Sequence, residues 1–180
     1  GRDLMTWEQD EISEYSWCPD GLKEYLNAIE CIEQLLGRSN LNKEHVDNFG
    51  NSAMIHACSA GEPKVIMDMF DKGFAIGEAN HSGIHPLHYL ARSKRYDALQ
   101  YFLDSTKINP NIVDANGWTP AHYLADQGGI PAMAQQLIEK GIDLNTASTN
   151  AFAVFPEGTK ASEVAMHWND DKMAQLLSAN

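Results

Sequence analysis

The chain has 180 residues, of which 43% are hydrophobic and 21% are charged, and its 25 acidic and 13 basic side chains give a formal net charge of −12. A chain of this length can bury a sufficient core as one domain, and its three cysteines are too few for a secreted disulfide scaffold, so we expect an intracellular protein, cytosolic or nuclear. The acidic balance disfavours nucleic acids, because affinity for phosphate backbones comes largely from Lys and Arg, and no apolar run reaches the length of a membrane span.

Residues 1–20 form an acidic segment in which tryptophan and tyrosine side chains stand among Asp and Glu. This composition is usually a solvated face, although it can also steer a basic partner. Residues 21–45 follow helix-start signals at Pro19 and Asp20, and they carry an apolar stripe of helical spacing at Ile32, Leu35 and Leu36. We interpret this second stretch as an N-terminal capping unit.

The rest of the chain repeats two signals with a period of about 33 residues. One signal is a turn glycine, found at Gly50, Gly83 and Gly117. The other is an apolar triple with i, i+3, i+4 spacing, which places three side chains on one stripe of a helix. Its clearest copies are Ile66/Met69/Phe70, Leu99/Phe102/Leu103 and Ala134/Leu137/Ile138. Such a period is typical of stacked repeats that bury their apolar faces against one another.

A second, shorter helix is predicted between each turn glycine and the apolar triple that follows it. Pro86 and Pro120 suit the first turn of such a helix, where a missing N–H costs no hydrogen bond. Thr119, directly before Pro120, can cap the free N–H groups of the helix. Each repeat is therefore expected to hold two helices.

These segments resemble the ankyrin-repeat family. The matching stretches are Thr119-Pro120-Ala121-His122, His85-Pro86-Leu87-His88 and the hairpin Gly141-Ile142-Asp143-Leu144-Asn145. The resemblance implies an all-α solenoid of helix-turn-helix units with β-hairpin loops, about five units including divergent terminal caps. Within it we expect three full repeats over residues 46–147 and a C-terminal capping repeat over residues 148–180, with an inserted hairpin loop. Two departures from the pattern are Ile55, at the motif histidine position, and Lys94, in place of a helix-ending glycine.

Histidine and cysteine side chains raise the question of metal or thiol chemistry. His81, His85 and His88 are close in sequence, but the family resemblance gives His88 a structural role between neighbouring hairpins. Cys58 and His56 lie two residues apart on a predicted helix and so point about 200° from each other. The sequence carries no P-loop, HExxH or similar motif. We therefore expect a noncatalytic chain without metal or cofactor, and metal or thiol chemistry at these residues is the alternative.

The positions beside each turn glycine and at the end of each short helix do not pack against neighbours in this architecture, so we predict that they bind a partner on the concave face. They are Phe49, Asn51, His81, Ile84, Arg92, Asn116, Trp118 and Asp126. Phe49, Ile84 and Trp118 are prominent, because a large apolar side chain gains nothing from exposure but is a typical interface hot spot. The alternative for Trp118 is that it covers an adjacent hairpin.

The expected insertion adds Phe152 and Phe155 as candidate partner-binding residues. This loop either folds back as a lid over the last repeat or grips a ligand, and both interpretations stay open at this point. The family resemblance also implies that hairpin asparagines with a leucine eight residues earlier, Asn111 and Asn145, can be hydroxylated. The alternative is that Asn simply suits the turn geometry.

Together these features predict a noncatalytic protein–protein interaction module that binds a protein or peptide and acts as a monomer. The acidic balance favours a partner with a basic surface. The alternative is the substrate-recruiting portion of a larger enzyme, or of a bacterial effector acting in the cytosol of a host cell. The start at Gly1-Arg2, without a methionine, keeps that alternative open.

Overall fold

The computed structural model describes residues 37, 42–60, 62–105 and 108–178. The chain divides into a unit of residues 1–41 and a unit of residues 42–180, and the fold is described for the second. The expected acidic segment, residues 1–20, and nearly all of the expected N-terminal capping unit, residues 21–45, lie outside the described residues.

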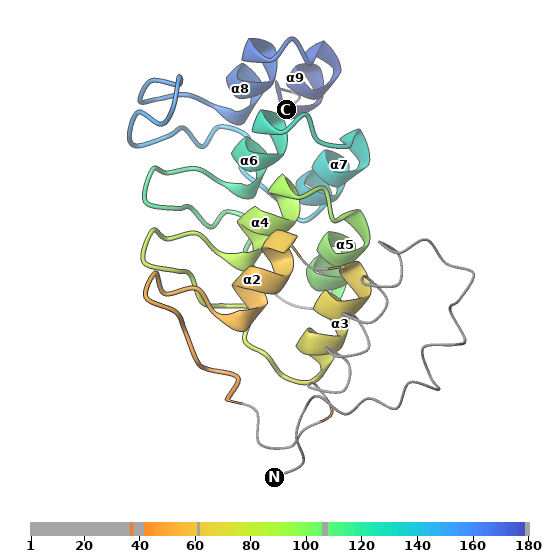
Figure 1. The fold of residues 1–180 in the computed structure, drawn as a ribbon. Helices are drawn as coiled ribbons and strands as arrows, with labels where there is room; N and C mark the ends of the chain where they lie inside the picture. The colour runs from red at the N-terminus through yellow and green to blue at the C-terminus, as the bar shows by residue number, and fades with distance from the viewer. Residues whose placement is uncertain (1–36, 38–41, 61, 106–107, 179–180) are drawn as a thin grey trace, which may run out of the picture. The chain divides into compact units, whose positions relative to one another are not determined.

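Eight helices make up the described part of the chain, and they come in four consecutive pairs. The pairs are α2 (Ala53–Ala60) with α3 (Pro63–Asp71), α4 (Pro86–Arg92) with α5 (Tyr96–Ser105), α6 (Pro120–Asp126) with α7 (Pro131–Glu139), and α8 (Ala161–His167) with α9 (Asp171–Ser178). The first members of the pairs stack on one another in one layer and the second members in another, while the connecting loops project from the first layer (Figure 1). This arrangement confirms the predicted all-α solenoid.

Proline residues mark the start of several helices, and residues in the left-handed backbone conformation follow the end of others. Proline occupies the first turn of α3, α4, α6 and α7, where its fixed φ is helical and no N–H is needed. Gly128, Lys94 and Asn169 follow α6, α4 and α8 with φ of 59°, 57° and 59°. Lys94 thus adopts the left-handed conformation of the glycine that it replaces, at a backbone cost of about 1–2 kcal/mol.

The core runs along the stack as a chain of interfaces between neighbouring pairs. The outer helices bury Val65, Ile66, Met69, Ala98, Leu99, Phe102, Leu103, Met133, Ala134, Leu137, Met173, Ala174 and Leu177. On the inner layer Cys58, Ala91 and Ala125 are 0% exposed, because the next inner helix covers each of them. Burying one such leucine or isoleucine contributes about 1.5–3 kcal/mol, so stability grows with each interface added.

The loops that precede the inner helices are tight turns bonded to one another in a ladder. The amides of His81, Ala115 and Thr149 donate to the carbonyls of Phe49, Ser82 and Asn116, at 3.0, 3.0 and 2.9 Å. Turn glycines allow this approach, since a Cβ on Gly117 would lie 2.5 Å from the Thr149 nitrogen, and Gly117 has φ of 77°. The ladder holds the hairpin tips in a fixed row.

Candidate partner-binding surface

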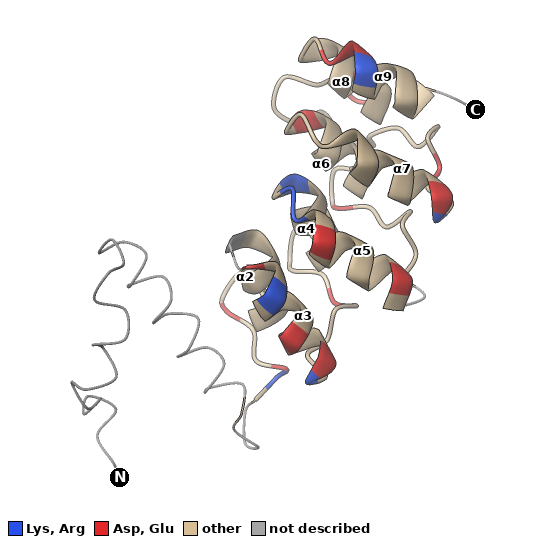
Figure 2. Cartoon of the chain, turned by 90° about the vertical axis from the view of Figure 1, so that its right-hand side faces the viewer, with Lys and Arg blue, Asp and Glu red and all other residues tan. Residues whose placement is uncertain are grey.

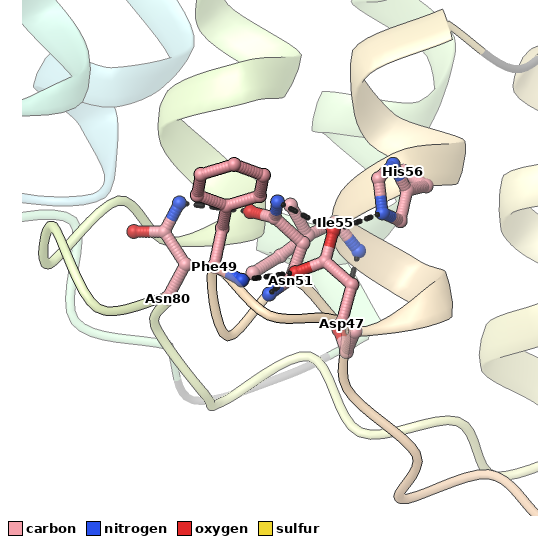
Figure 3. A network of polar contacts seen from close by, with 7 residues as sticks. Asp47, Phe49, Asn51, Ile55, His56 and Asn80 are labelled. Carbon is pink, nitrogen blue, oxygen red and sulfur yellow. Dashed lines mark hydrogen bonds and ion pairs between the residues drawn. The ribbon is translucent and has the colours of Figure 1, made fainter.

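The first hairpin tip is organised by the carboxylate of Asp47 (Figure 3). Asp47 Oδ1 accepts from the amides of Phe49 and Asn51, both at 2.8 Å, and Oδ2 contacts the Asn51 side chain and His56 Nε2 at 3.0 Å each. The Asn51 side chain and the further hydrogen bonds hold the pKa of Asp47 well below its ordinary value. The network fixes the tip while leaving the Phe49 side chain 72% exposed.

Asn51 serves the scaffold as well as the surface. Its Oδ1 accepts from Asn80 Nδ2 at 2.8 Å, which links the first hairpin to the second (Figure 3). In the second hairpin the amides of Ser82 and Ile84 donate to Asn80 Oδ1, at 3.0 and 2.9 Å. His81 is exposed beside this turn, and Ile84 is half-buried.

Trp118 does not lie on the surface, which corrects the expectation of an exposed tip residue. Its side chain is 0% exposed and packs against the rings of His122, Tyr123, Phe152 and Phe155, at centroid distances of 5.6, 5.5, 4.8 and 5.6 Å. The cause is the inserted loop that follows, which brings two phenylalanines onto the indole. The alternative in which Trp118 covers an adjacent hairpin therefore agrees with its packing against Phe152 and Phe155.

The inserted loop folds back on the stack through a tight turn. Phe152 and Phe155 exchange both backbone hydrogen bonds at 2.9 Å. Phe155 is 5% exposed, so its side chain is a core residue of the last unit and the expectation of a surface position is wrong. Phe152 lies edge-on against Trp118 and is 36% exposed. The loop thus has the geometry of a lid, with Val154 at its turn 65% exposed.

The third hairpin is held by hydrogen bonds to Asp114 from its own amides and from Tyr123 of α6. Asp114 Oδ1 accepts from the amides of Asn116 and Trp118 at 2.8 Å each, and Tyr123 Oη donates to Asp114 Oδ2 at 2.8 Å. Burial, followed by the bond to the Asp114 carboxylate, raises the pKa of Tyr123. Asn116 stays half-buried at the turn, where its carbonyl accepts from the next hairpin.

The ends of the inner helices form the second part of the candidate surface, after the hairpin tips. Arg92 ends α4 and is exposed, and in Figure 2 the ribbon has the blue of Lys and Arg at this end of α4 and in the loop that follows it. Asp126 ends α6 and is half-buried; its Oδ1 accepts from Trp168 Nε1 at 3.2 Å. Trp168, directly after α8, is 51% exposed. We call the hairpin tips and these helix ends together the tip-and-helix surface.

Sequence reasoning missed two exposed apolar residues near this surface: Met166 and Trp168. Trp168 and Met166 fall at the end of the last inner helix, where no repeat motif marks a position as exposed. A signal was nevertheless present, because Met166 corresponds to Ala91 and Ala125 of the preceding inner helices. A large side chain in place of alanine sets this position apart from its counterparts in the preceding inner helices.

His85 and His88 occupy structural positions. His85 Nδ1 accepts from the Leu87 amide at 3.1 Å, and His88 Nδ1 accepts from the His85 amide at 2.9 Å while its Nε2 faces the Ile112 carbonyl at 3.3 Å. Burial lowers the pKa of both His85 and His88 to about 4, so both rings are neutral at pH 7. Within the described ranges no three His, Cys, Asp or Glu side chains gather closely enough to hold a metal ion.

Cys58 is a packing residue in α2. It is 0% exposed, and burial raises the pKa of its thiol to about 12. The thiol therefore stays protonated at neutral pH and is a poor nucleophile. Asn111, the residue considered for hydroxylation, bonds the Gly141 carbonyl with its Nδ2 at 3.0 Å and ties one repeat to the next.

The chain matches the family model for ankyrin repeats (3 copies) over residues 24–114 and 66–148, and it therefore belongs to the ankyrin-repeat family. Ankyrin repeats are generally protein-interaction modules, and the repeat is itself noncatalytic. Among the helices of the described residues, none is long and apolar enough to cross a bilayer.

Three relatives show the settings in which similar repeats occur. The chain is 29% identical to ankyrin repeat protein nuc-2 of Neurospora crassa over 120 residues, 66% of this chain and 11% of that protein. It is 23% identical to palmitoyltransferase ZDHHC17 of Rattus norvegicus over 138 residues, 69% of this chain and 22% of that one. Tyrosine-protein kinase Shark of Drosophila melanogaster is 22% identical over 127 residues, 70% of this chain and 13% of the kinase. The chain thus spans less than a quarter of the length of each of these relatives.

Proposed function

We propose that this chain is a noncatalytic module that binds a partner protein or peptide on its tip-and-helix surface. The observation that carries the proposal is Phe49, a phenylalanine that is 72% exposed on a hairpin tip held by at least four hydrogen bonds to Asp47. An ordered, exposed aromatic ring adds little to folding, whereas it offers a partner apolar area at a small entropy cost. Trp168, 51% exposed and oriented by Asp126, has the same character.

The tip-and-helix surface also carries charged residues of both signs and further polar residues. Arg92 and Asp126 end adjacent inner helices, and His81 and Asn116 belong to adjacent hairpins. A surface with charges of both signs favours a partner that carries the opposite charge at each facing position, because like charges that face each other repel. The net charge of −12 favours a partner with a basic surface over a nucleic acid. We expect the module to act as a monomer.

The test is affinity capture with quantitative mass spectrometry, comparing wild type with Phe49→Ala/Trp168→Ala. A matched control changes exposed residues of the outer layer, Gln135→Ala/Lys172→Ala. We expect the double surface variant to lose the proteins that wild type enriches, and the control to retain them, because one truncated aromatic hot spot costs about 2 kcal/mol or more. Equal capture by both folded variants would show that the partner binds elsewhere.

A second candidate function is recruitment of substrates for a larger enzyme or for an effector that acts inside a host cell. Support comes from the relatives, since a palmitoyltransferase and a tyrosine-protein kinase match this chain over 22% and 13% of their lengths. The test is to sequence the gene on both sides of the 180 codons. A continuous reading frame with a catalytic motif supports recruitment, and stop signals at both borders contradict it.

A further inference from the structure

The ends of the inner helices α4, α6 and α8 form a row. Arg92 is the last residue of α4, Asp126 is the last residue of α6, and Trp168 directly follows His167 at the end of α8. Each of these helices packs against the next one in the stack. Because packed helices lie about 8–10 Å apart, Arg92 and Asp126 occupy neighbouring positions at roughly that spacing.

Hydrogen bonds between consecutive units hold this spacing. In α6, His122 Nδ1 accepts from the Thr119 amide and Nε2 donates to the Thr159 carbonyl of the next unit, both at 3.1 Å. In α4, His88 Nε2 makes the same forward hydrogen bond to the Ile112 carbonyl at 3.3 Å. Both imidazole rings are buried, so the inner helices cannot shift along one another without breaking buried hydrogen bonds. The row of helix ends is therefore organised before a partner arrives, which lowers the entropy cost of binding.

The Asp126 carboxylate and the Trp168 indole lie together in this row. Asp126 Oδ1 accepts from Trp168 Nε1 at 3.2 Å, and its Oδ2 accepts from Gln127 Nε2 at 2.7 Å. Both donors are neutral, and among the described residues no Lys, Arg or His forms an ion pair with Asp126. The charge is thus uncompensated, the carboxylate has acceptor sites left, and the indole beside it is 51% exposed. An exposed indole next to such a carboxylate suits a cation.

Arg92 presents the opposite charge one helix away. Its side chain is exposed and forms no ion pair within the described part of the chain, and Lys94, two residues later, is also exposed and without an ion pair there. Burial and the bond to Asp114 raise the pKa of Tyr123, and the charge of Arg92 opposes that rise, so the guanidinium lies within electrostatic reach of α6. The row therefore offers an anion a place beside the place for a cation.

From this geometry we infer that the row binds an extended segment of a partner polypeptide in which an arginine and an acidic residue stand about three residues apart. The guanidinium of that arginine stacks on the Trp168 indole and donates to the Asp126 carboxylate, which a planar group with several donors can do at once. The acidic side chain pairs with Arg92. An extended chain rises about 3.3 Å per residue, so three residues span neighbouring helix ends.

This inference rests on the proposed function and specifies the partner's chemistry at the helix ends. The first test is selection of random nonapeptides displayed on phage against the full chain. We expect the enriched sequences to carry Arg and Asp or Glu two to four positions apart, because long side chains tolerate about one position either way. The inference is overturned if no sequence is enriched or if the enriched sequences lack this pair.

Repeating the selection with Phe49→Ala/Trp168→Ala separates the inference from the proposed function. If sequences without the pair bind wild type and are lost with this variant, the tip-and-helix surface stands and only the inference fails. If such sequences bind both chains alike, the proposed function is contradicted as well.

The second test measures the cation contact by calorimetric titration with one selected peptide. Asp126→Asn removes the charge but keeps an oxygen that can accept from Trp168 Nε1, and citrulline replaces the peptide arginine with an uncharged analogue. Each change alone should raise Kd at least about tenfold, a loss of about 1.4 kcal/mol. In the Asp126→Asn variant, the exchange for citrulline should raise Kd by less than about threefold, because the contact is already lost.

The anion contact is measured in the same way, with Arg92→Gln and with the amide analogue of the peptide's acidic residue. A matched control, Glu139→Gln/Lys140→Gln, removes one exposed charge of each sign from the end of α7 and should leave Kd unchanged. The inference is overturned if citrulline weakens binding to the Asp126→Asn variant as much as to wild type, or if the control loses as much affinity as the row variants.

Discussion

The interior unit built on α6 and the edge unit built on α8 have the same plan but treat the same motif positions differently. His122, Ala125 and Gly117 are all covered by the unit that follows them. Their counterparts Glu163 and Met166 are exposed, and Gly158 has nothing within 4 Å of an added Cβ. The comparison teaches that the neighbour in the stack, more than the local helix, decides which side chain a position accepts.

The largest effect is expected at Trp118, which the inserted loop turns from a tip residue into a core residue. Trp118→Ala should lower the free energy of unfolding by about 3–5 kcal/mol, because it leaves a cavity beneath Phe152 and Phe155. Phe49→Ala, at a counterpart tip that nothing covers, should change it by less than about 0.5 kcal/mol. Urea unfolding followed by circular dichroism measures both. Similar losses for the two variants would refute the difference between the tips.

The next effect tests the interior histidine against the edge glutamate. His122→Glu places a carboxylate against the Thr159 carbonyl in a buried site and removes the forward hydrogen bond, so a loss of about 3 kcal/mol is expected. Glu163→His, at the open edge, should cost less than about 0.5 kcal/mol. Thermal unfolding of both variants gives the comparison, and an equal cost at the two positions would contradict it.

A smaller effect separates the glycines of the two units. Gly117 and Gly158 have φ of 77° and 85°, so alanine strains both by a similar amount. Only at Gly117 would the Cβ meet a backbone atom, the Thr149 nitrogen at 2.5 Å. We expect Gly117→Ala to cost about 1–3 kcal/mol more than Gly158→Ala. Should the two variants unfold at the same denaturant concentration, the close packing of the hairpin tips would be wrong.

The smallest effect is the pH dependence of the interior histidine. The pKa of His88 in the folded protein is about 4, below the ordinary value near 6.5 of an unfolded chain. The unfolded chain therefore binds more protons between these values, and the free energy of unfolding falls as the pH drops below about 6.5. From pH 7 to pH 5 we expect a loss of about 1–2 kcal/mol from this residue.

His88→Gln is the matched variant, because an amide can accept from the His85 amide and donate to the Ile112 carbonyl without titrating. Urea unfolding at pH 7 and pH 5 should show a smaller loss for His88→Gln than for wild type. Equal losses would mean that the neutral imidazole does not govern this dependence.

The period of the sequence predicted the fold well because helix stripes and turn glycines are local signals. Ile66, Leu99 and Leu137 each mark a helix face, and each is buried. Lys94 also kept its turn despite breaking the glycine pattern, since the flanking helices over-determine its conformation. Local pattern and stacking agree at these positions.

The candidate surface was harder to predict because exposure depends on residues far along the chain. Phe49 and Trp118 look alike as aromatic residues at hairpin tips, yet one is 72% and the other 0% exposed. The difference comes from Phe152 and Phe155, more than 30 residues after Trp118. No motif within a single repeat encodes that contact. Trp168 was missed for the same reason, because its orientation depends on Asp126 of the preceding unit.

The most direct test of the account is hydrogen–deuterium exchange of the chain with and without a partner recovered by affinity capture. Binding on the tip-and-helix surface predicts slower exchange at the hairpin tips around Phe49 and His81 and at the end of α8 near Trp168. Exchange of the outer helices α3, α5 and α7 should stay unchanged. Protection confined to those outer helices, with the tips unaffected, would contradict the account.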